Sequence, residues 1–141
     1  MRREQEPKPI PPYQAVPRAY ATLAEDFLAD PTPERGRRLW TQELRLQEEL
    51  ERPGRFPLGQ LVMTTGAGDV LTASFHTPME FLLRHKNGDW GQLEPEDLAA
   101  NEDALRQGSR LVSSYRTRRE DKLWVITERD RSLTTLLLPS E

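Results

Sequence analysis

The chain has 141 residues, a length that favours one domain with a core of its own, and it contains no cysteine, which excludes disulfides, thiolate metal sites and cysteine nucleophiles. The net charge of −3 excludes a global basic field, so any attraction for nucleic acid has to come from a local cluster. No apolar run approaches the roughly 20 residues of a membrane span, and the N-terminus lacks the apolar segment of a secretion signal. We therefore expect a cytoplasmic protein.

The N-terminal part is predicted to be an arm followed by two helices. Seven of the 12 prolines lie in the first 33 residues, which favours an extended, proline-rich arm over 1–18. Apolar residues at helical spacing predict a helix over 19–29, and Thr32-Pro33-Glu34 is a helix start that leads to a second helix over 33–51. We interpret residues 19–55 as a helical extension of a core domain over 56–141.

The core domain is predicted to be α+β, with helices on one face of a four-stranded, mainly antiparallel sheet. A first strand is expected over 58–64 and is followed by helices over 67–75, 78–86 and 95–107. Strands are then expected over 109–117, 121–128 and 133–138. The connections between these last three strands are too short for parallel crossovers, so they should form antiparallel hairpins.

Charged residues are unevenly distributed in this core. Residues 89–103 carry six acidic groups and no lysine or arginine, whereas residues 110–131 carry seven basic and four acidic groups. Two solvated faces would explain the pattern. The alternative is an anion site on the last hairpin, where Arg129 and Arg131 flank Asp130 and are followed by Ser132 and Thr134. In that case Arg131→Ala should abolish binding with little loss of stability; otherwise Asp130 and Ser132 cap the turn and the arginines face water.

Four segments carry a resemblance to a known family: FPLGQLVMTTGA, FLLRHKNGDWGQL, LAANEDALRQGSRLVSSY and KLWVITERDRSLTTLLLP. They lie in this order between Phe56 and Pro139 and resemble an uncharacterised family of small proteins carried on plasmids and integrated elements. Its members are labelled plasmid-related protein or modification subunit of a type I restriction system. The chemistry of the second label is excluded, because the chain lacks the glycine-rich cofactor turn and the Asn/Asp-Pro-Pro-Tyr/Phe motif of a DNA methyltransferase.

The C-terminal segment RLVSSYRTRREDKLWVITERDRSLTT is also similar to the end of barnase-type and RelE-like ribonucleases. The resemblance implies a sheet that holds RNA, with Arg106 and Arg110 as phosphate contacts and Glu96 near the position of the general base. Arg131 stands where those enzymes use a general-acid histidine, and an arginine cannot give up a proton at neutral pH. His85 is a weak candidate for the missing acid; a histidine favoured at the C-terminus of its helix is the simpler interpretation.

The remaining candidates are aromatic and acidic residues. Trp40 lies on the N-terminal helix and could face a partner, whereas Trp90, in the tight loop Asp89-Trp90-Gly91, either fills the core or anchors a partner. The acidic helix over 95–107 is stabilised by negative charge at its N-terminus, and it could also mimic nucleic-acid phosphate. We expect no cofactor and no metal site, because His76 and His85 stand nine residues apart without a ligand partner one turn away.

Three hypotheses follow. The first is a non-catalytic accessory protein of mobile genetic elements that binds nucleic acid or a nucleoprotein partner, with Arg106, Arg110, Arg129 and Arg131 as anion contacts. The second is a toxin-like ribonuclease that uses Glu96 as base. The third is an inhibitor of a host defence system that binds a protein target through the acidic helix.

Overall fold

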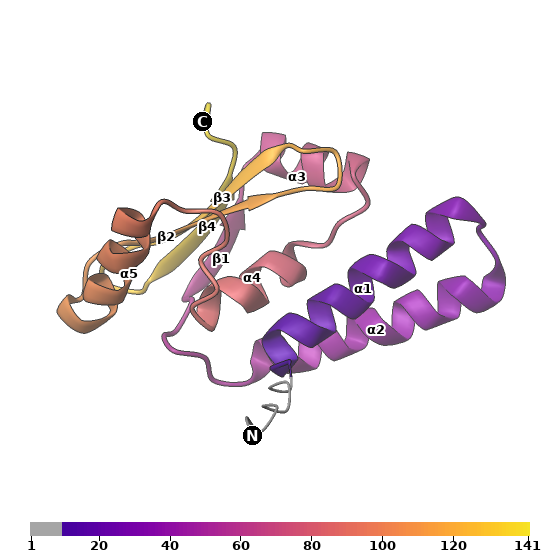
Figure 1. Cartoon of the computed structure of the whole chain (residues 1–141), viewed down its shortest axis with the longest axis horizontal. Helices are drawn as coiled ribbons and strands as arrows, with labels where there is room; N and C mark the ends of the chain where they lie inside the picture. The colour runs from indigo at the N-terminus through magenta and orange to yellow at the C-terminus, as the bar shows by residue number, and fades with distance from the viewer. Residues whose placement is uncertain (1–9) are drawn as a thin grey trace, which may run out of the picture.

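The computed structural model describes residues 10–141 and shows an α+β fold (Figure 1). Its helices and strands follow the order α1 (Pro12–Ala29), α2 (Pro33–Glu51), β1 (Gln60–Met63), α3 (Thr65–Ala73), α4 (Pro78–Lys86), α5 (Pro95–Gln107), β2 (Leu111–Arg116), β3 (Lys122–Thr127) and β4 (Leu133–Leu137). Every element predicted from the sequence is present, and the largest differences concern α1 and the direction of β1.

The four strands form one mixed sheet in the order β1-β4-β3-β2. The predicted antiparallel hairpins β2–β3 and β3–β4 are confirmed, but β1 pairs with β4 in parallel, with Gln60 opposite Leu133 and Met63 opposite Leu136. The expectation of a mainly antiparallel sheet is therefore wrong. Because two hairpins reverse the chain twice, β4 runs parallel to β2, and the three helices α3–α5 form the long crossover that a parallel connection from β1 requires.

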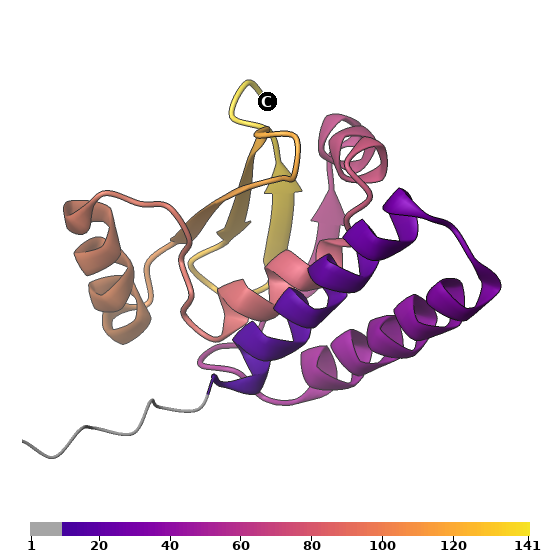
Figure 2. The ribbon, with the colours of Figure 1, turned by 45° about the vertical axis from the view of Figure 1, so that its right-hand side comes forward.

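Helices cover one face of the sheet in two layers (Figure 2). Helix α4 packs on that face, and the α1–α2 hairpin packs on α4 from outside. Helix α3 lies at the β1 edge and α5 lies at the β2 edge. The main core is formed where α3 and α4 meet the sheet, and its buried members are Ala67, Leu71, Phe81, Leu82, Tyr115, Leu123, Val125 and Leu136.

The predicted arm over 1–18 is corrected by α1, which begins at Pro12 instead of Ala19. Proline at the first helical position costs no hydrogen bond, and Pro17 lies one turn further on, inside the helix and buried. The number of prolines alone indicated an extended segment, because it does not take into account where in a helix each proline would lie. Residues 1–9 of the predicted arm lie outside the described part of the chain.

Helices α2, α4 and α5 have the bounds predicted for them, and the starts of α2 and α4 carry complete capping signals. Thr32 accepts a hydrogen bond from the Arg35 amide at the start of α2. Thr77 and Glu80 form a reciprocal capping box at the start of α4. Helix α3 begins at Thr65, earlier than predicted, because Thr64 is its cap and accepts from the amide of Ala67.

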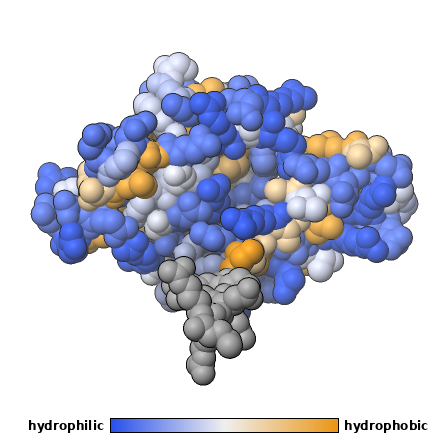
Figure 3. Space-filling model, viewed as in Figure 1, coloured by the Kyte–Doolittle hydropathy of each residue, from blue (hydrophilic) through white to orange (hydrophobic). Residues whose placement is uncertain are grey.

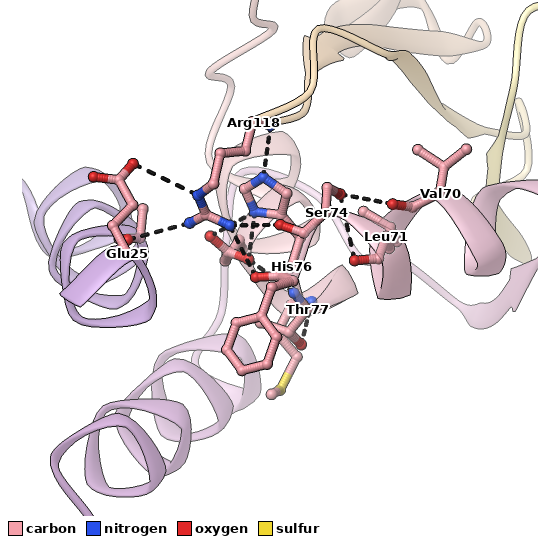
Figure 4. A network of polar contacts seen from close by, with 11 residues as sticks. Glu25, Val70, Leu71, Ser74, His76, Thr77 and Arg118 are labelled. Carbon is pink, nitrogen blue, oxygen red and sulfur yellow. Dashed lines mark hydrogen bonds and ion pairs between the residues drawn. The ribbon is translucent and has the colours of Figure 1, made fainter. Parts of the chain in front are cut away.

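The hairpin turn between β2 and β3 is tied to α1 by Arg118 (Figure 4). Its guanidinium donates to the carbonyl oxygens of Ser74 at 2.7 Å, Phe75 at 3.0 Å and Ala21 at 3.2 Å. Its backbone amide donates to Nε2 of His76 at 3.0 Å. Since Nε2 accepts, the remaining ring proton is on Nδ1, which faces the carboxylate of Glu80 at 3.1 Å. One residue thus connects the hairpin turn, the α3–α4 loop and α1.

Candidate functional site

The guanidinium of Arg131, the central residue of the predicted anion site, is hydrogen-bonded to backbone carbonyls of the protein itself. Its guanidinium donates to the carbonyl oxygens of Ser109 at 2.6 Å, Ala104 at 3.1 Å and Glu128 at 3.1 Å. The carbonyl of Ala104 belongs to the last turn of α5 and also accepts from the backbone amides of Gly108 and Ser109. Arg131 therefore joins the end of α5 to the β3–β4 turn, and its guanidinium donors serve backbone carbonyls; its role as an anion contact stays a prediction.

The other three predicted arginines are exposed. Arg106 pairs with Asp103 at 2.5 Å and Arg110 with Glu128 at 3.3 Å, and their side chains are 74% and 60% exposed. Ion pairs this exposed contribute little free energy and exchange readily with another anion. Arg110 and Arg129 line one shallow hollow of about 340 Å³ with Ser109 and Glu128, so these two arginines do lie together.

Ser132 and Thr134 serve the local structure. The amide and the hydroxyl of Ser132 donate to Oδ1 of Asp130 at 3.0 and 2.6 Å, and these hydrogen bonds hold the pKa of Asp130 below its ordinary value. The turn-capping interpretation fits this contact. Thr134 is fully buried, and its hydroxyl donates to the carbonyl oxygen of Leu58 at 2.6 Å; its role as an anion contact stays a prediction.

His85 is enclosed in the core instead of lying at an exposed helix end. Its Nδ1 is 2.5 Å from Oγ of Ser113, and its Nε2 is 2.9 Å from Oγ1 of Thr127, which in turn is 2.8 Å from Oγ1 of Thr134. The hydroxyl of Thr134 donates to Leu58, so the hydroxyl of Thr127 must donate to that of Thr134. Every hydrogen bond in this network then has one donor and one acceptor if Nε2 of His85 carries the ring proton and Ser113 donates to Nδ1.

Burial lowers the pKa of His85 to about 3, with a smaller contribution from the positive charge of Arg131. The imidazole is therefore neutral at physiological pH and has no exposed surface. The neutral ring does not act as a cation at the helix end, and the general-acid role stays a prediction that this enclosed environment does not favour. Glu96 lies in the first turn of α5 and is exposed, where negative charge stabilises the helix.

The two tryptophans predicted as partner contacts have opposite environments. Trp90 is 4% exposed, stacks on Phe56 and donates from Nε1 to Glu102 at 3.2 Å, so it belongs to the core. Hydrogen bonds from Arg55 and then Trp90 lower the pKa of Glu102 to about 2. Trp40 is 61% exposed on α2, which keeps it available for a partner.

The face of the sheet that α4 does not cover carries a row of half-buried apolar side chains. Alternate residues of the strands point to this outer face, and its apolar members are Val62, Val112, Trp124, Ile126, Leu133 and Leu137. Helix α5 forms a wall beside it, since Asn101 bonds both the amide and the carbonyl of Val112 at the sheet edge. A groove of about 300 Å³ runs between this wall and Trp124.

Basic residues stand at both ends of the outer face. Arg110 and Arg129 lie where β2 begins and β3 ends, and Arg116 and Lys122 lie at the opposite ends of the same strands. Arg116 and Lys122 are directly opposite each other in the register of β2 and β3, and both are exposed. Like charges in this position destabilise a sheet, and an anionic partner would remove the cost. The two basic ends are separated by six residues of strand, about 20 Å.

Sequence reasoning missed this outer face. Strand β3 reads KLWVIT, in which apolar residues occupy both alternating sets, Leu123 and Val125 in the core and Trp124 and Ile126 outside. Apolar residues on both faces are typical of a strand covered on both sides. This pattern could have indicated an apolar outer face, because the helices cover only one face of the sheet and its edges.

A second hollow, of about 230 Å³, lies between α1, α4 and the end of β2. Its charged side chains are largely satisfied within the protein: Arg84 pairs with Asp89 at 2.7 Å, and His76 faces Glu80. At the ends of the outer face, Arg110 pairs with Glu128 at 3.3 Å and Arg116 donates to Gln92 at 3.0 Å, whereas Lys122 and Arg129 make no ion pair with any residue in 10–141.

A scan against family models finds no match for this chain, and searches of curated proteins and of solved structures find none either. The resemblances to plasmid-borne proteins and to ribonucleases stay predictions. Within residues 10–141, no helix is long and apolar enough to cross a membrane. No three histidine or acidic side chains of those residues are grouped so that they could hold a metal ion.

Proposed function

We propose that this chain is a non-catalytic accessory protein of mobile genetic elements that binds a nucleoprotein partner on the outer face of its sheet. The observation that carries the proposal is the uncovered row of apolar side chains around Trp124 between two basic ends. The apolar centre requires an apolar strip on a protein, and the basic ends attract acidic side chains or phosphates at the borders of that strip.

The resemblance to barnase-type ribonucleases supports the use of this sheet as a binding surface, and the antiparallel β2–β3–β4 unit agrees with it in strand layout. The ribonuclease alternative gains no support from the candidate residues. His85 is enclosed in the core and neutral, and Arg131 is bonded to backbone carbonyls. Binding without hydrolysis is the function that these side chains favour.

The test is affinity capture of partners from the native host, with and without nuclease treatment, using the wild type and three variants. Trp124→Ala and Lys122→Glu change the outer face, whereas Arg119→Glu is a matched charge reversal in the exposed β2–β3 turn. We expect the first two to reduce recovery of the partner about tenfold or more and the third to leave it unchanged. Recovery that is equal for all four proteins would overturn the proposal.

Nuclease treatment and salt then separate the two components of the partner. A protein that stays bound after nuclease treatment and is lost in Trp124→Ala supports docking through the apolar strip. Recovery that requires intact nucleic acid and falls steeply with salt, with no effect of Trp124→Ala, would instead assign binding to phosphate contacts alone and would overturn the apolar docking.

A further inference from the structure

Helix α2 carries an apolar and charged stripe on the side that faces away from the rest of the protein. Arg37, Thr41, Leu44 and Glu48 lie on one line along the helix, because residues at i, i+4, i+7 and i+11 share a face. Trp40 lies beside this line. All five are exposed, and the buried residues Leu39 and Leu46 lie on the opposite side, against α1 and α4.

The apolar part of this stripe is unusually exposed. Trp40 is 61% and Leu44 is 41% exposed, and the two stand one helical turn apart. Tryptophan is among the residues that most often carry the free energy of an interface, and one that keeps most of its surface in water is costly in a monomer. The α1–α2 hairpin extends past the sheet, so no other described segment approaches this side (Figure 2).

The charges along α2 run opposite to the order that an isolated helix favours. Arg35, Arg37 and Arg38 lie in its N-terminal half, whereas Glu48, Glu49 and Glu51 lie at its C-terminal end, where no basic residue occurs in the last turn. The helix macrodipole favours acidic residues at the start and basic residues at the end, so this order costs stability. Neither Arg37 nor Glu48 makes an ion pair with any residue in 10–141.

These observations fit one occupant, a second copy of the same helix in antiparallel orientation. We propose that two copies of this chain associate through the outer stripes of α2, with the Trp40–Leu44 segments at the centre. This arrangement places Arg37 of each copy opposite Glu48 of the other, about 16 Å from the equivalent pair at the opposite end. A parallel arrangement would instead place Arg37 against Arg37 and Glu48 against Glu48.

The geometry also sets the strength that we expect. An isologous interface repeats each contact, so each dimer gains two Arg37–Glu48 pairs and one joint Trp40–Leu44 centre. A single pair of helices buries less than the about 1,200–2,000 Å² of a stable interface. The dissociation constant should therefore lie in a range of about 10–100 µM. This self-association is independent of the sheet face and of the function proposed for it.

In Figure 3 the surface is mainly hydrophilic, and one of several separate apolar areas lies over the outer end of the α1–α2 hairpin. On that end Leu28 of α1 is 48% exposed.

The test is sedimentation velocity of the full chain and of charge-reversed variants over concentrations of about 1–300 µM. Arg37→Glu and Glu48→Arg each place like charges at both ends of the interface, so each variant alone should be monomeric over this range. A one-to-one mixture of the two variants should form a dimer, because each pair then contains one acidic and one basic side chain. Arg119→Glu, which changes the net charge by the same amount as Arg37→Glu, should dimerise like the wild type.

Trp40→Ala should weaken the dimer about tenfold or more in the same experiment. Circular dichroism checks that every variant keeps its helices; all of the changed side chains are exposed. A wild type that stays monomeric at about 300 µM would overturn the proposal. So would a mixture of Arg37→Glu and Glu48→Arg that does not associate, since only reciprocal contacts between two copies of α2 predict that recovery.

Discussion

At the scale of single residues, three basic side chains of this protein bind backbone carbonyls of segments far away in the sequence. They are Lys86, Arg118 and Arg131, and their acceptors include the carbonyl oxygens of Glu49, Leu50 and Arg52 for Lys86 and of Ala104 and Ser109 for Arg131. Carbonyls at helix ends lack partners, and a charged donor satisfies them strongly. A basic residue counted in the sequence is therefore not automatically available to a ligand.

Removal of the Arg131 side chain should lower the free energy of unfolding by about 2 kcal/mol, because the carbonyls of Ser109, Ala104 and Glu128 each lose a charged donor. Its backbone is left-handed, with φ at 61°, a conformation that costs about 1 kcal/mol for any residue but glycine. Arg131→Gly should thus be about 1 kcal/mol more stable than Arg131→Ala. Urea denaturation of both variants measures the contribution of the side chain and the cost of the left-handed backbone. An Arg131→Ala variant as stable as the wild type would show that the side chain does not stabilise the fold.

The environment of His85 predicts a loss of stability in acid. Because its pKa falls from an ordinary value of 6.5 to about 3 on folding, only the unfolded chain takes up this proton between those pH values. The stabilisation is complete above pH 6.5 and is lost as the pH falls towards 3. The slope contributed by this residue approaches about 1.4 kcal/mol per pH unit near pH 5.

Two measurements check this prediction. Nuclear magnetic resonance of the folded protein should show a His85 ring that stays neutral down to about pH 5. Urea denaturation of His85→Gln, which cannot take up a proton, should show a shallower dependence of stability on pH than the wild type. A His85 resonance that titrates near pH 6.5 in the folded state would contradict the enclosed, neutral imidazole.

At the scale of elements, the helices and strands that were predicted most accurately are those whose sequence signals lie within a few neighbouring residues. Helices α2 and α4 were predicted with their observed bounds because threonine caps and prolines mark their starts within four residues. Helix α1 was predicted too short because Pro17 is compatible with a helix only through its tertiary packing. The direction of β1 depends on a partner strand about 70 residues away, and no local pattern contains that information.

The candidate site was less predictable than the fold. The arginine cluster was identified from charge, but whether a guanidinium faces water depends on which carbonyls the fold brings near it, as for Arg131. Trp40, which was predicted to be able to face a partner, is exposed because the thin apolar stripe of α2 leaves no second side to bury it; its partner role stays a prediction. For Trp124 the sequence shows that the residue lies in a strand but not that one face of the sheet is left uncovered.

At the scale of the whole molecule, the α1–α2 hairpin is attached to the sheet indirectly. It packs on α4, and Arg118 adds a polar connection between the β2–β3 turn and α1 (Figure 4). The guanidinium of Arg118 is mostly enclosed, and among residues 10–141 its Nε has no hydrogen-bond acceptor, only the carboxylate of Glu25 at 3.5 Å. Most of its contribution must therefore come from the carbonyls of Ser74, Phe75 and Ala21.

Arg118→Ala should loosen the hairpin more than it loosens the sheet. Three carbonyls lose charged donors, so the free energy of unfolding should fall by about 2–4 kcal/mol, and Arg119→Ala, at the exposed neighbouring position, should change it by less than about 0.5 kcal/mol. Hydrogen exchange locates the effect, because the amides of α1 should lose more protection than those of β3. Equal loss of protection in α1 and β3 would mean that the hairpin and the sheet unfold as one cooperative unit, with Arg118 stabilising both alike.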